Sequence, residues 1–358
     1  MNTLPGIKEV MIKGLNRDSK IVIGGSLDKL GGYIPKSNVI IITDERVHEL
    51  YSSRFPDFPV IRIKSGEELK NLGTIEFIYS QLLALKADRN TYILGIGGGV
   101  ICDIAGFAAS TFLRGLRFGF VATTLLAQVD ASIGGKNGVN FSGFKNIIGV
   151  FNQPELVICD HSLLKTLDEY EFLSGLGEVL KYGFIGDPEI LNYFKPEKFV
   201  NREDLQLIHE LVVKSVHIKK STVEKDEMET GERRLLNFGH TFGHAIESAH
   251  GLSHGMAVTY GMLAAIYISE REGYLSLDES KMARDIILNS GIIRRVQINL
   301  DKLQTQFIVD KKRSGKFLYF VLLHSFGNAF SEKIEIGKIN NWLVDWVNWE
   351  DAFTLDRI

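Results

Sequence analysis

The first half of the chain alternates short apolar runs with longer stretches of helical spacing. Apolar runs of about 4–8 residues are typical of buried strands, and apolar residues three or four positions apart are typical of amphipathic helices. Helical spacing covers 45–55 and 67–85. The strand-like runs lie at 21–25, 38–43, 60–64, 92–96, 118–122 and 156–159. Because strands that alternate with helices favour parallel pairing, this half predicts an open parallel α/β sheet.

The pattern changes after about residue 160. One strand-like run remains at 317–323, and the other segments have helical spacing. The predicted helices are 163–186, 202–223, 232–249, 255–272 and 278–290. At roughly 150 residues per domain, a chain of 358 residues accommodates two domains. We therefore expect an α/β domain over 1–162 and a mainly α-helical domain over 163–358.

Composition excludes several classes of protein. The net charge of −3 gives no basic excess, so we expect neither a nucleic acid partner nor a membrane surface. No apolar run approaches the ~18 residues of a membrane span. A count of two cysteines argues against a disulfide framework and favours a reducing compartment. Since the first residues also do not resemble a signal peptide, we expect a cytoplasmic location.

A glycine cluster follows the strand predicted at 92–96. Residues 92–103 read YILGIGGGVICD, a strand that runs into glycines and then into a helix near Val100. Such a turn brings backbone N–H groups close to a phosphate at a helix N-terminus, so it predicts a dinucleotide site; a glycine-rich turn without a ligand is the alternative. Asp44, at another strand end, could bind a ribose or cap a helix.

Four of the nine histidines lie between residues 240 and 254: His240, His244, His250 and His254. On a helix, residues four apart share one face, and that spacing suits a divalent metal with a carboxylate as third ligand. The spacing leaves open whether His240 acts with His244 or with His254. Glu178 and Lys181 lie three apart on a predicted apolar helix, where they form either a surface ion pair or a buried pair that requires a metal and an anionic substrate.

A third cluster combines glycines and lysines within 123–149. Lys136 follows two glycines, and Lys145 and Asn146 follow Gly143. Glycine loops that present lysines suit an anionic small molecule, although a solvated loop would have the same composition. Further cationic candidates are Lys181, Lys219, Arg233, Lys311 and Lys312. Together they would suit a substrate that carries both phosphate and carboxylate.

These segments together resemble the 3-dehydroquinate synthases of the sugar-phosphate cyclase family, from about Asp44 to about Gly327. The matching motifs are GEELK (66–70), GGGVICD (97–103), LRG (113–115), TTLLAQVDASIGGKNGVN (123–140), KNIIG (145–149), GEVLKYG (177–183), LNFGHTFGHAIE (236–247), HGMAV (254–258) and DKK (310–312). The motifs occur in the family's order. Four positions depart from the usual pattern: Cys102, Ala122, Phe144 and Met256.

The resemblance implies a role for each matching residue. It assigns a divalent metal, zinc or cobalt, to Glu178, His240 and His254. It assigns NAD to Asp44, Glu67, Lys70, Gly98, Gly99, Val100, Asp103, Thr123, Thr124, Lys136 and Lys145. It assigns catalysis to Lys136, Lys181, Lys219, Arg233, Asn237 and His244, the last facing the substrate phosphate. It assigns substrate binding to Arg114, Asp130, Lys145, Asn146, Lys311 and Lys312, with Arg114 reaching a neighbouring subunit of a homodimer.

The implied reaction converts 3-deoxy-D-arabino-heptulosonate 7-phosphate to 3-dehydroquinate and phosphate, a lyase step of the shikimate pathway to aromatic amino acids. It proceeds by transient oxidation with NAD, phosphate elimination, re-reduction, ring opening and aldol closure. Three alternatives remain: a metal-dependent polyol dehydrogenase, a cyclase for another sugar phosphate, and a non-catalytic binding protein. A dehydrogenase would release NADH, and a non-catalytic protein would bind neither metal nor NAD.

Overall fold

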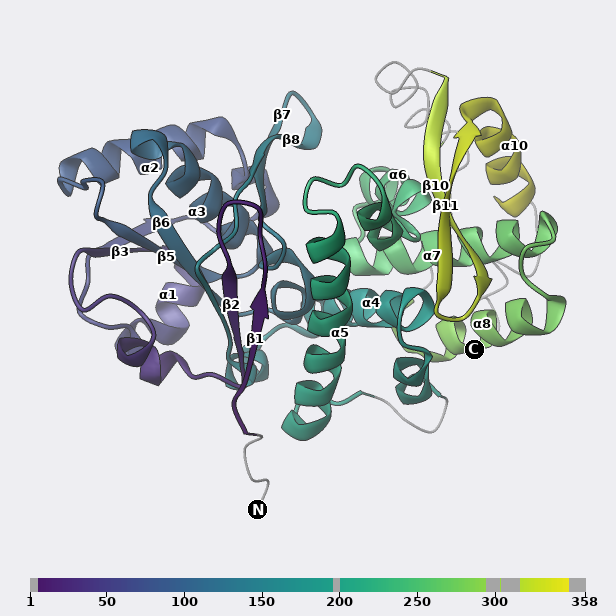
Figure 1. The fold of residues 1–358 in the computed structure, drawn as a ribbon, viewed down its shortest axis with the longest axis horizontal. Helices are drawn as coiled ribbons and strands as arrows, with labels where there is room; N and C mark the ends of the chain where they lie inside the picture. The colour runs from purple at the N-terminus through teal and green to yellow at the C-terminus, as the bar shows by residue number, and fades with distance from the viewer. Residues whose placement is uncertain (1–5, 196–199, 294–302, 304–315, 348–358) are drawn as a thin grey trace. The chain divides into compact units, whose positions relative to one another are not determined.

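The computed structural model describes residues 6–195, 200–293, 303 and 316–347 (Figure 1). The chain divides into two compact units. The first consists of Met1–Asp168 and Arg202–Met228, and the second of Glu169–Asn201 and Glu229–Ile358. Among the described residues, no helix combines the length and the apolar character that crossing a membrane requires.

The first unit is built on a seven-stranded sheet with strand order β1-β2-β9-β6-β5-β3-β4. Its strands are β1 (Lys8–Ile12), β2 (Ser19–Ile23), β3 (Val39–Asp44), β4 (Val60–Ile63), β5 (Tyr92–Gly97), β6 (Arg117–Ala122) and β9 (Leu156–Cys159). β1 pairs antiparallel with β2, and the other neighbours pair in parallel. The inner strands β5 and β9 are buried along their whole length, as in sheets covered on both faces. The predicted parallel α/β sheet is confirmed.

The connections of this sheet bring three strand ends to one edge. β3 leads through α1 (Glu45–Tyr51) to β4, whereas β5 leads through α3 (Gly99–Thr111) in the opposite direction to β6. The strand order therefore reverses between β3 and β5, and open α/β sheets bind ligands beyond the carboxyl ends of strands at such a point. Asp44 ends β3 and Gly97 ends β5, while Thr123 directly follows β6.

Helices and a hairpin complete the first unit. α2 (Leu72–Ala84) precedes β5, and the hairpin of β7 (Lys136–Phe141) and β8 (Phe144–Phe151) extends away from the sheet (Figure 1). The short 3-10 turns are Leu27–Gly32, Ser52–Arg54, Glu67–Leu69, Phe112–Arg114 and His161–Thr166. α5 (Leu205–Lys225) packs in this unit against β1 and against a π-helical turn at Ala127–Ala131.

The described part of the second unit is mainly helical. Its elements are α4 (Glu169–Ile185), α6 (His240–His250), α7 (His254–Arg271), α8 (Leu277–Asn289), α10 (Ile336–Val347), the hairpin of β10 (Phe317–Ser325) and β11 (Asn328–Glu335), and 3-10 turns at Pro188–Tyr193 and Glu232–Asn237. α7 is the central helix: α4, α6, α8 and β10 all pack against it, and 14 of its 18 residues are buried. The expected helical half is confirmed for the described residues.

Two expected helices are interrupted for local reasons. The spacing predicts one helix over 67–85, but α2 begins only at Leu72, because the Asn71 side chain caps it by accepting from the Thr74 N–H (3.0 Å). The helix expected over 232–249 breaks at Gly239, which has a φ of +79°. The predicted domain boundary after residue 162 stays a prediction.

A chain of hydrogen bonds buried in the first unit fixes the protonation of His161. The Gln128 amide group donates to the carbonyl oxygens of Ala122 and Asp160 (both 3.0 Å), so Gln128 Oε1 accepts from His161 Nδ1 (2.8 Å). His161 Nε2 must then accept from His209 Nδ1 (3.2 Å). Burial, and to a lesser extent the adjacent His209, lower the pKa of His161 to about 3.

This shift predicts a pH dependence of stability. Below pH 6.5 the unfolded chain protonates His161 while the folded chain does not, so stability falls as the pH falls from about 6.5 towards about 3. Between pH 7 and pH 5 this residue should reduce the free energy of unfolding by about 2 kcal/mol. His161→Gln retains a donor and an acceptor but does not titrate, so it should lose less stability over that range. Denaturant unfolding of both proteins at the two pH values measures the difference. An equal loss in both would contradict the assignment.

Candidate functional site

Three side chains of the second unit bring their ligand atoms together. Glu178 lies on α4, and His240 and His254 are the first residues of α6 and α7. One ligand atom from each lies within 4.8 Å of the others. From Glu178 Oε1, His254 Nε2 is 3.3 Å away and His240 Nε2 is 3.7 Å away. Ligands ~2.0–2.2 Å from a tetrahedral zinc lie about 3.3–3.6 Å apart, so this donor set fits one divalent metal.

Close backbone packing of three helices creates this cluster. A Cβ atom on Gly177 would overlap the backbone of Gly255, and these glycines adjoin Glu178 and His254 in sequence. Similarly, a Cβ atom on Gly261 of α7 would overlap the carbonyl of Gly239, the residue before His240. Since only glycine lets backbones approach this closely, the glycines determine how near the three ligand-bearing helix segments lie.

The second nitrogen of each histidine has its own partner. His240 Nδ1 donates to the Phe238 carbonyl (3.2 Å), and His254 Nδ1 lies 3.4 Å from Glu247 Oε2. Both contacts direct Nε2 towards Glu178, which is how partners behind metal-ligating histidines orient them. The sequence analysis did not identify Glu247 as a site residue. Its position, seven residues before the predicted ligand His254, could have marked it as a candidate.

Burial and neighbouring charges set opposite pKa shifts in the two rings. Burial lowers the pKa of His240 well below its usual value, and the charge of Lys181 lowers it further. Burial acts on His254 in the same direction, but hydrogen bonds and charges from Glu178 and Glu247 outweigh it and raise its pKa to about 9. Two carboxylates therefore favour a positive charge at His254, which a metal cation would also supply.

Glu178 and Lys181 form an ion pair inside α4. Their side chains are 0% and 1% exposed, so the pair is buried and the reading as a surface ion pair is wrong. Lys181 Nζ also lies 4.9 Å from the centre of the Tyr182 ring. Burying a charged group without a partner costs free energy. Here the lysine and the two imidazoles lie close enough to the Glu178 carboxylate to act as its partners.

His244 lies beside the cluster. Its ring centre is 5.3 Å from that of His240 and 5.8 Å from that of His254. His244 also forms a second possible ligand group with Glu247 and His254. The geometry groups His240 with His254 and Glu178, while neither ligand group among the described residues includes His250.

In the first unit, the candidate nucleotide residues gather where the strand order reverses. Gly98 is the N-cap residue of α3 and has no side chain with which to cap the first turn, so those N–H groups suit an anion. Asp44 caps α1 by accepting from the Val47 N–H (2.9 Å) and also accepts from Ser65 Oγ (3.0 Å). The capping reading of Asp44 is therefore correct, and a ribose contact through the same carboxylate stays a prediction.

Two ion pairs of the first unit involve candidate residues. Lys70 Nζ lies 2.5 Å from Asp103 Oδ2, and burial raises the pKa of Asp103 despite the opposing charge of Lys70. Lys219 on α5 binds Asp130 through Oδ1 (2.7 Å) and the carbonyl oxygen (2.6 Å). α5 thus places a buried lysine at the π-helical turn, although the two residues are 89 positions apart.

The remaining described candidates occupy four regions. Lys136, Lys145 and Asn146 are exposed on the β7–β8 hairpin, and Arg114 is exposed with a φ of +69°. Thr124 caps the following turn by accepting from the Ala127 N–H (3.1 Å), next to buried Thr123. In the second unit, Arg233 is buried and Asn237 donates to Glu229 Oε1 (2.6 Å). Lys311 and Lys312 lie outside the described residues.

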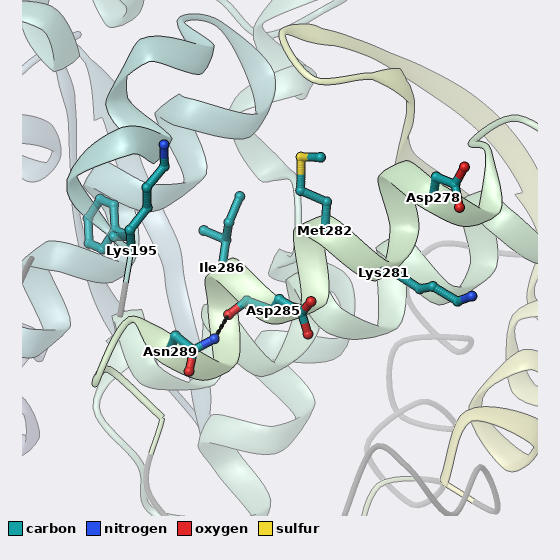
Figure 2. A pocket seen from close by; sticks show the side chains of 8 residues that line it. Lys195, Asp278, Lys281, Met282, Asp285, Ile286 and Asn289 are labelled. Atoms are coloured by element: carbon teal, nitrogen blue, oxygen red, sulfur yellow. Dashed lines mark hydrogen bonds between the residues drawn. The ribbon is translucent and has the colours of Figure 1, made fainter. Parts of the chain in front are cut away.

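A separate groove of about 450 Å³ lies between α8 and residues 194–195 of the second unit (Figure 2). Met282 points into it, and Asn289 Nδ2 donates to the Asp285 carbonyl at one end (2.7 Å). None of the predicted site residues lines this groove. It therefore has no part in the candidate site.

Comparisons with known proteins agree with this arrangement. The family models for the N-terminal and C-terminal parts of 3-dehydroquinate synthase match residues 60–174 and 175–313. The 3-dehydroquinate synthase of Clostridium botulinum is 38% identical over 348 residues, covering 92% of this chain and 99% of that protein. The one from Acetivibrio thermocellus is 44% identical over 265 residues, covering 73% of each.

Solved structures share the fold at lower identity. A 2-deoxy-scyllo-inosose synthase complexed with carbaglucose-6-phosphate, NAD+ and Co2+ has a TM-score of 0.83 at 24% identity, covering 94% of this chain and 100% of that one. A 2-epi-5-epi-valiolone synthase of Streptomyces hygroscopicus with NAD+ and Zn2+ bound has a TM-score of 0.79 at 24% identity, covering 93% and 97%.

The sheet, the central α7 and the ligand cluster define a protein with the sugar-phosphate cyclase fold. Within that class, the two family models together span residues 60–313, more than half of the chain. The chain belongs to the 3-dehydroquinate synthase family.

The geometry predicts a graded effect of three substitutions on zinc affinity. His254→Ala removes a ligand atom and should abolish binding of one equivalent. Glu247→Gln keeps the ligand but weakens its orienting contact, so affinity should fall about 10–100-fold. His244→Ala should retain zinc because it alters no atom of the three-ligand group. Isothermal titration of the metal-free proteins with zinc measures all three.

The matched comparison is between His254→Ala and His244→Ala, two identical changes on neighbouring rings. If both lost zinc equally, the assignment of His254 rather than His244 would be wrong. Circular dichroism of each variant checks that the helices of the second unit have formed.

Proposed function

We propose that this protein catalyses the 3-dehydroquinate synthase reaction, releasing phosphate from 3-deoxy-D-arabino-heptulosonate 7-phosphate as a carbon–oxygen lyase. The observation that carries the proposal is the group formed by buried Glu178 and partly buried His240 and His254, in a chain whose two halves match the family. A curated relative whose match covers 92% of this chain bears that activity in its name. We further propose a cytoplasmic homodimer.

Zinc or cobalt would be held by the three ligands, as the cation content of the related structures supports. When bound, the metal supplies a Lewis acid for the hydroxyl and carbonyl oxygens of the substrate. The protein's own contribution is orientation, since Phe238 and Glu247 hold the two imidazole rings. Lys181 Nζ, which pairs with Glu178, would donate to a substrate oxygen.

NAD would bind at the carboxyl ends of β3 and β5, where the strand order of the sheet reverses. When bound, it supplies a hydride acceptor that is restored within each turnover. The N–H groups that follow Gly98 would bind its pyrophosphate, since no N-cap side chain occupies them. Asp44 would accept from a ribose hydroxyl, and the pair of Lys70 and Asp103 would fix the first turns of α3. Glu67, Gly99, Val100, Thr123 and Thr124 complete this proposed set.

The residues proposed to bind the substrate include cations and polar groups. Lys136, Lys145, Asn146, Asp130, Lys219 and Arg114 are the proposed residues of the first unit. Arg233, Asn237, Lys181 and His244 are those of the second, together with Lys311 and Lys312 outside the described residues. Arg233 suits bidentate contact with a carboxylate or phosphate, whereas each lysine supplies a compact charge. The phosphate oxygens would themselves accept the proton that elimination releases.

The direct test supplies purified protein with NAD, zinc or cobalt, and the heptulosonate phosphate. We expect equal amounts of phosphate and 3-dehydroquinate, the latter detected with a coupled dehydratase, without net NADH. Lys136→Met should lower kcat/KM about 100-fold, because a charge that binds the departing phosphate is lost. Lys281→Met, the same change at an exposed lysine of the separate groove, should leave kcat/KM unchanged.

Two results would overturn the proposal. Net NADH formation from a simple polyol, without phosphate release, would identify a metal-dependent dehydrogenase. Phosphate release from another sugar phosphate, with none from the heptulosonate phosphate, would identify a different cyclase.

A further inference from the structure

The β7–β8 hairpin contains an irregularity at the residues predicted to bind the substrate. Val139 pairs with Ile148, but the next registered pair is Phe141 with Phe144. Between these pairs β7 has one residue, Asn140, whereas β8 has three, Lys145–Ile147. β8 therefore bulges, and bulges commonly redirect side chains beside functional sites.

The side chain of Asn140 holds this bulge. Its Oδ1 accepts from the backbone N–H of Asn146 (2.9 Å). Asn146 has a φ of +51°, a left-handed conformation that residues other than glycine adopt infrequently. A hydrogen bond to its N–H thus stabilises the conformation that sets the direction of Lys145 and Asn146.

The same residue also contacts the segment Glu67–Asn71, some seventy positions earlier. Asn140 Nδ2 donates to Glu67 Oε1 (2.9 Å), and the Asn140 N–H donates to the Lys70 carbonyl (2.8 Å). A parallel bridge joins Asn71 to Asn140. Lys70 in turn pairs with Asp103 of α3. One asparagine therefore touches both the proposed nucleotide segment and the proposed anion-binding bulge.

These contacts require an amide at this position. A carboxylate acceptor, Glu67, lies on one side and an N–H donor, that of Asn146, lies on the other. An amide satisfies both at once because it carries one donor group and one acceptor. A carboxylate would satisfy only Asn146 and would face Glu67 as a like charge.

We propose that Asn140 is a positioning residue that couples the nucleotide segment Glu67–Asn71 to the anion-binding bulge Lys145–Ile147. The inference rests on the proposed function for the identity of the two ligands. The hydrogen bond from Asn140 to Glu67 favours the binding of NAD. The hydrogen bond that Asn140 accepts from Asn146 favours the binding of the substrate anion. Because both effects depend on one side chain, its loss lowers the affinity for both ligands.

Asn140→Asp is the most informative substitution. It is nearly isosteric, keeps the acceptor for Asn146, and replaces the donor to Glu67 with a negative charge. We expect the Kd for NAD to rise about tenfold or more, the size expected for losing a hydrogen bond to a charged group. We expect the Kd for inorganic phosphate, used as the anion probe, to rise severalfold, because repulsion from Glu67 displaces the introduced carboxylate and with it the Asn146 N–H.

A second substitution distinguishes coupling from general damage. In a Glu67→Gln background the glutamine amide can donate to the introduced carboxylate, so the contact re-forms with its polarity reversed. Adding Asn140→Asp to Glu67→Gln should therefore change the Kd for NAD by less than about twofold. Asn289→Asp makes the same chemical change at an exposed asparagine of α8 and should alter neither constant.

The inference is overturned if Asn140→Asp leaves both Kd values within twofold of the wild-type values. It is also overturned if Asn140→Asp raises the Kd for NAD by the same factor in the wild-type protein and in Glu67→Gln. If that variant does not fold, as judged by circular dichroism, Asn140→Ala replaces it with the same expected direction. Failure of the proposed function gives a different result. Wild-type protein would then bind no NAD, or would bind it without forming 3-dehydroquinate from the heptulosonate phosphate.

Discussion

Backbone contact between glycines is the constraint on which the candidate site depends. α4 and α7 touch at Gly177 and Gly255, and a side chain at either position would overlap the other helix. The contact of Gly239 with Gly261 brings the start of α6 equally close to α7. Helices with ordinary side chains at the contact pack with axes 8–10 Å apart, a typical range that is set by those side chains. Without the glycines, the carboxylate and two imidazoles borne by neighbouring residues would be too far apart to share one ion.

The same packing also costs the protein folding free energy. It places the Glu178 carboxylate and the Lys181 ammonium group where their side chains are 0% and 1% exposed to water. Removing a charge from water costs on the order of several kcal/mol per ion, and the attraction within a pair only partly offsets this. The ion pair is therefore not in itself a source of stability. The raised pKa of His254 reflects the two carboxylates, which favour positive charge at that ring.

The apolar pattern was sufficient to predict the parallel strands of the sheet and most helices, because both periodicities are local, but it did not predict the antiparallel edge strand β1. The ligand pairing was not predictable in this way. Residues four apart share a face only within one helix, and the chain leaves α6 at Gly251, with a φ of +65°, before α7 begins at His254. His254 therefore approaches the cluster from a new helix direction. Only the family resemblance selected it over His244.

The sequence could mark Glu247 as a candidate, but it could not show the contacts that Asn140 and Glu247 make, for a related reason. Asn140 meets Glu67 across 73 positions, and that meeting requires a bulge whose register depends on the folded hairpin. Glu247 is close to His254 in sequence, but its role requires knowing which nitrogen of that ring faces Glu178. Side chains that orient other side chains carry no periodic signal of their own.

Anomalous diffraction at the zinc absorption edge, from a crystal of the protein grown with zinc, tests the central claim most directly. The account predicts one strong peak in the second unit, ligated by Glu178 Oε1, His240 Nε2 and His254 Nε2. A peak ligated instead by His244 and Glu247, or by His250, would contradict it, as would the absence of any peak at these residues in a crystal that binds zinc elsewhere.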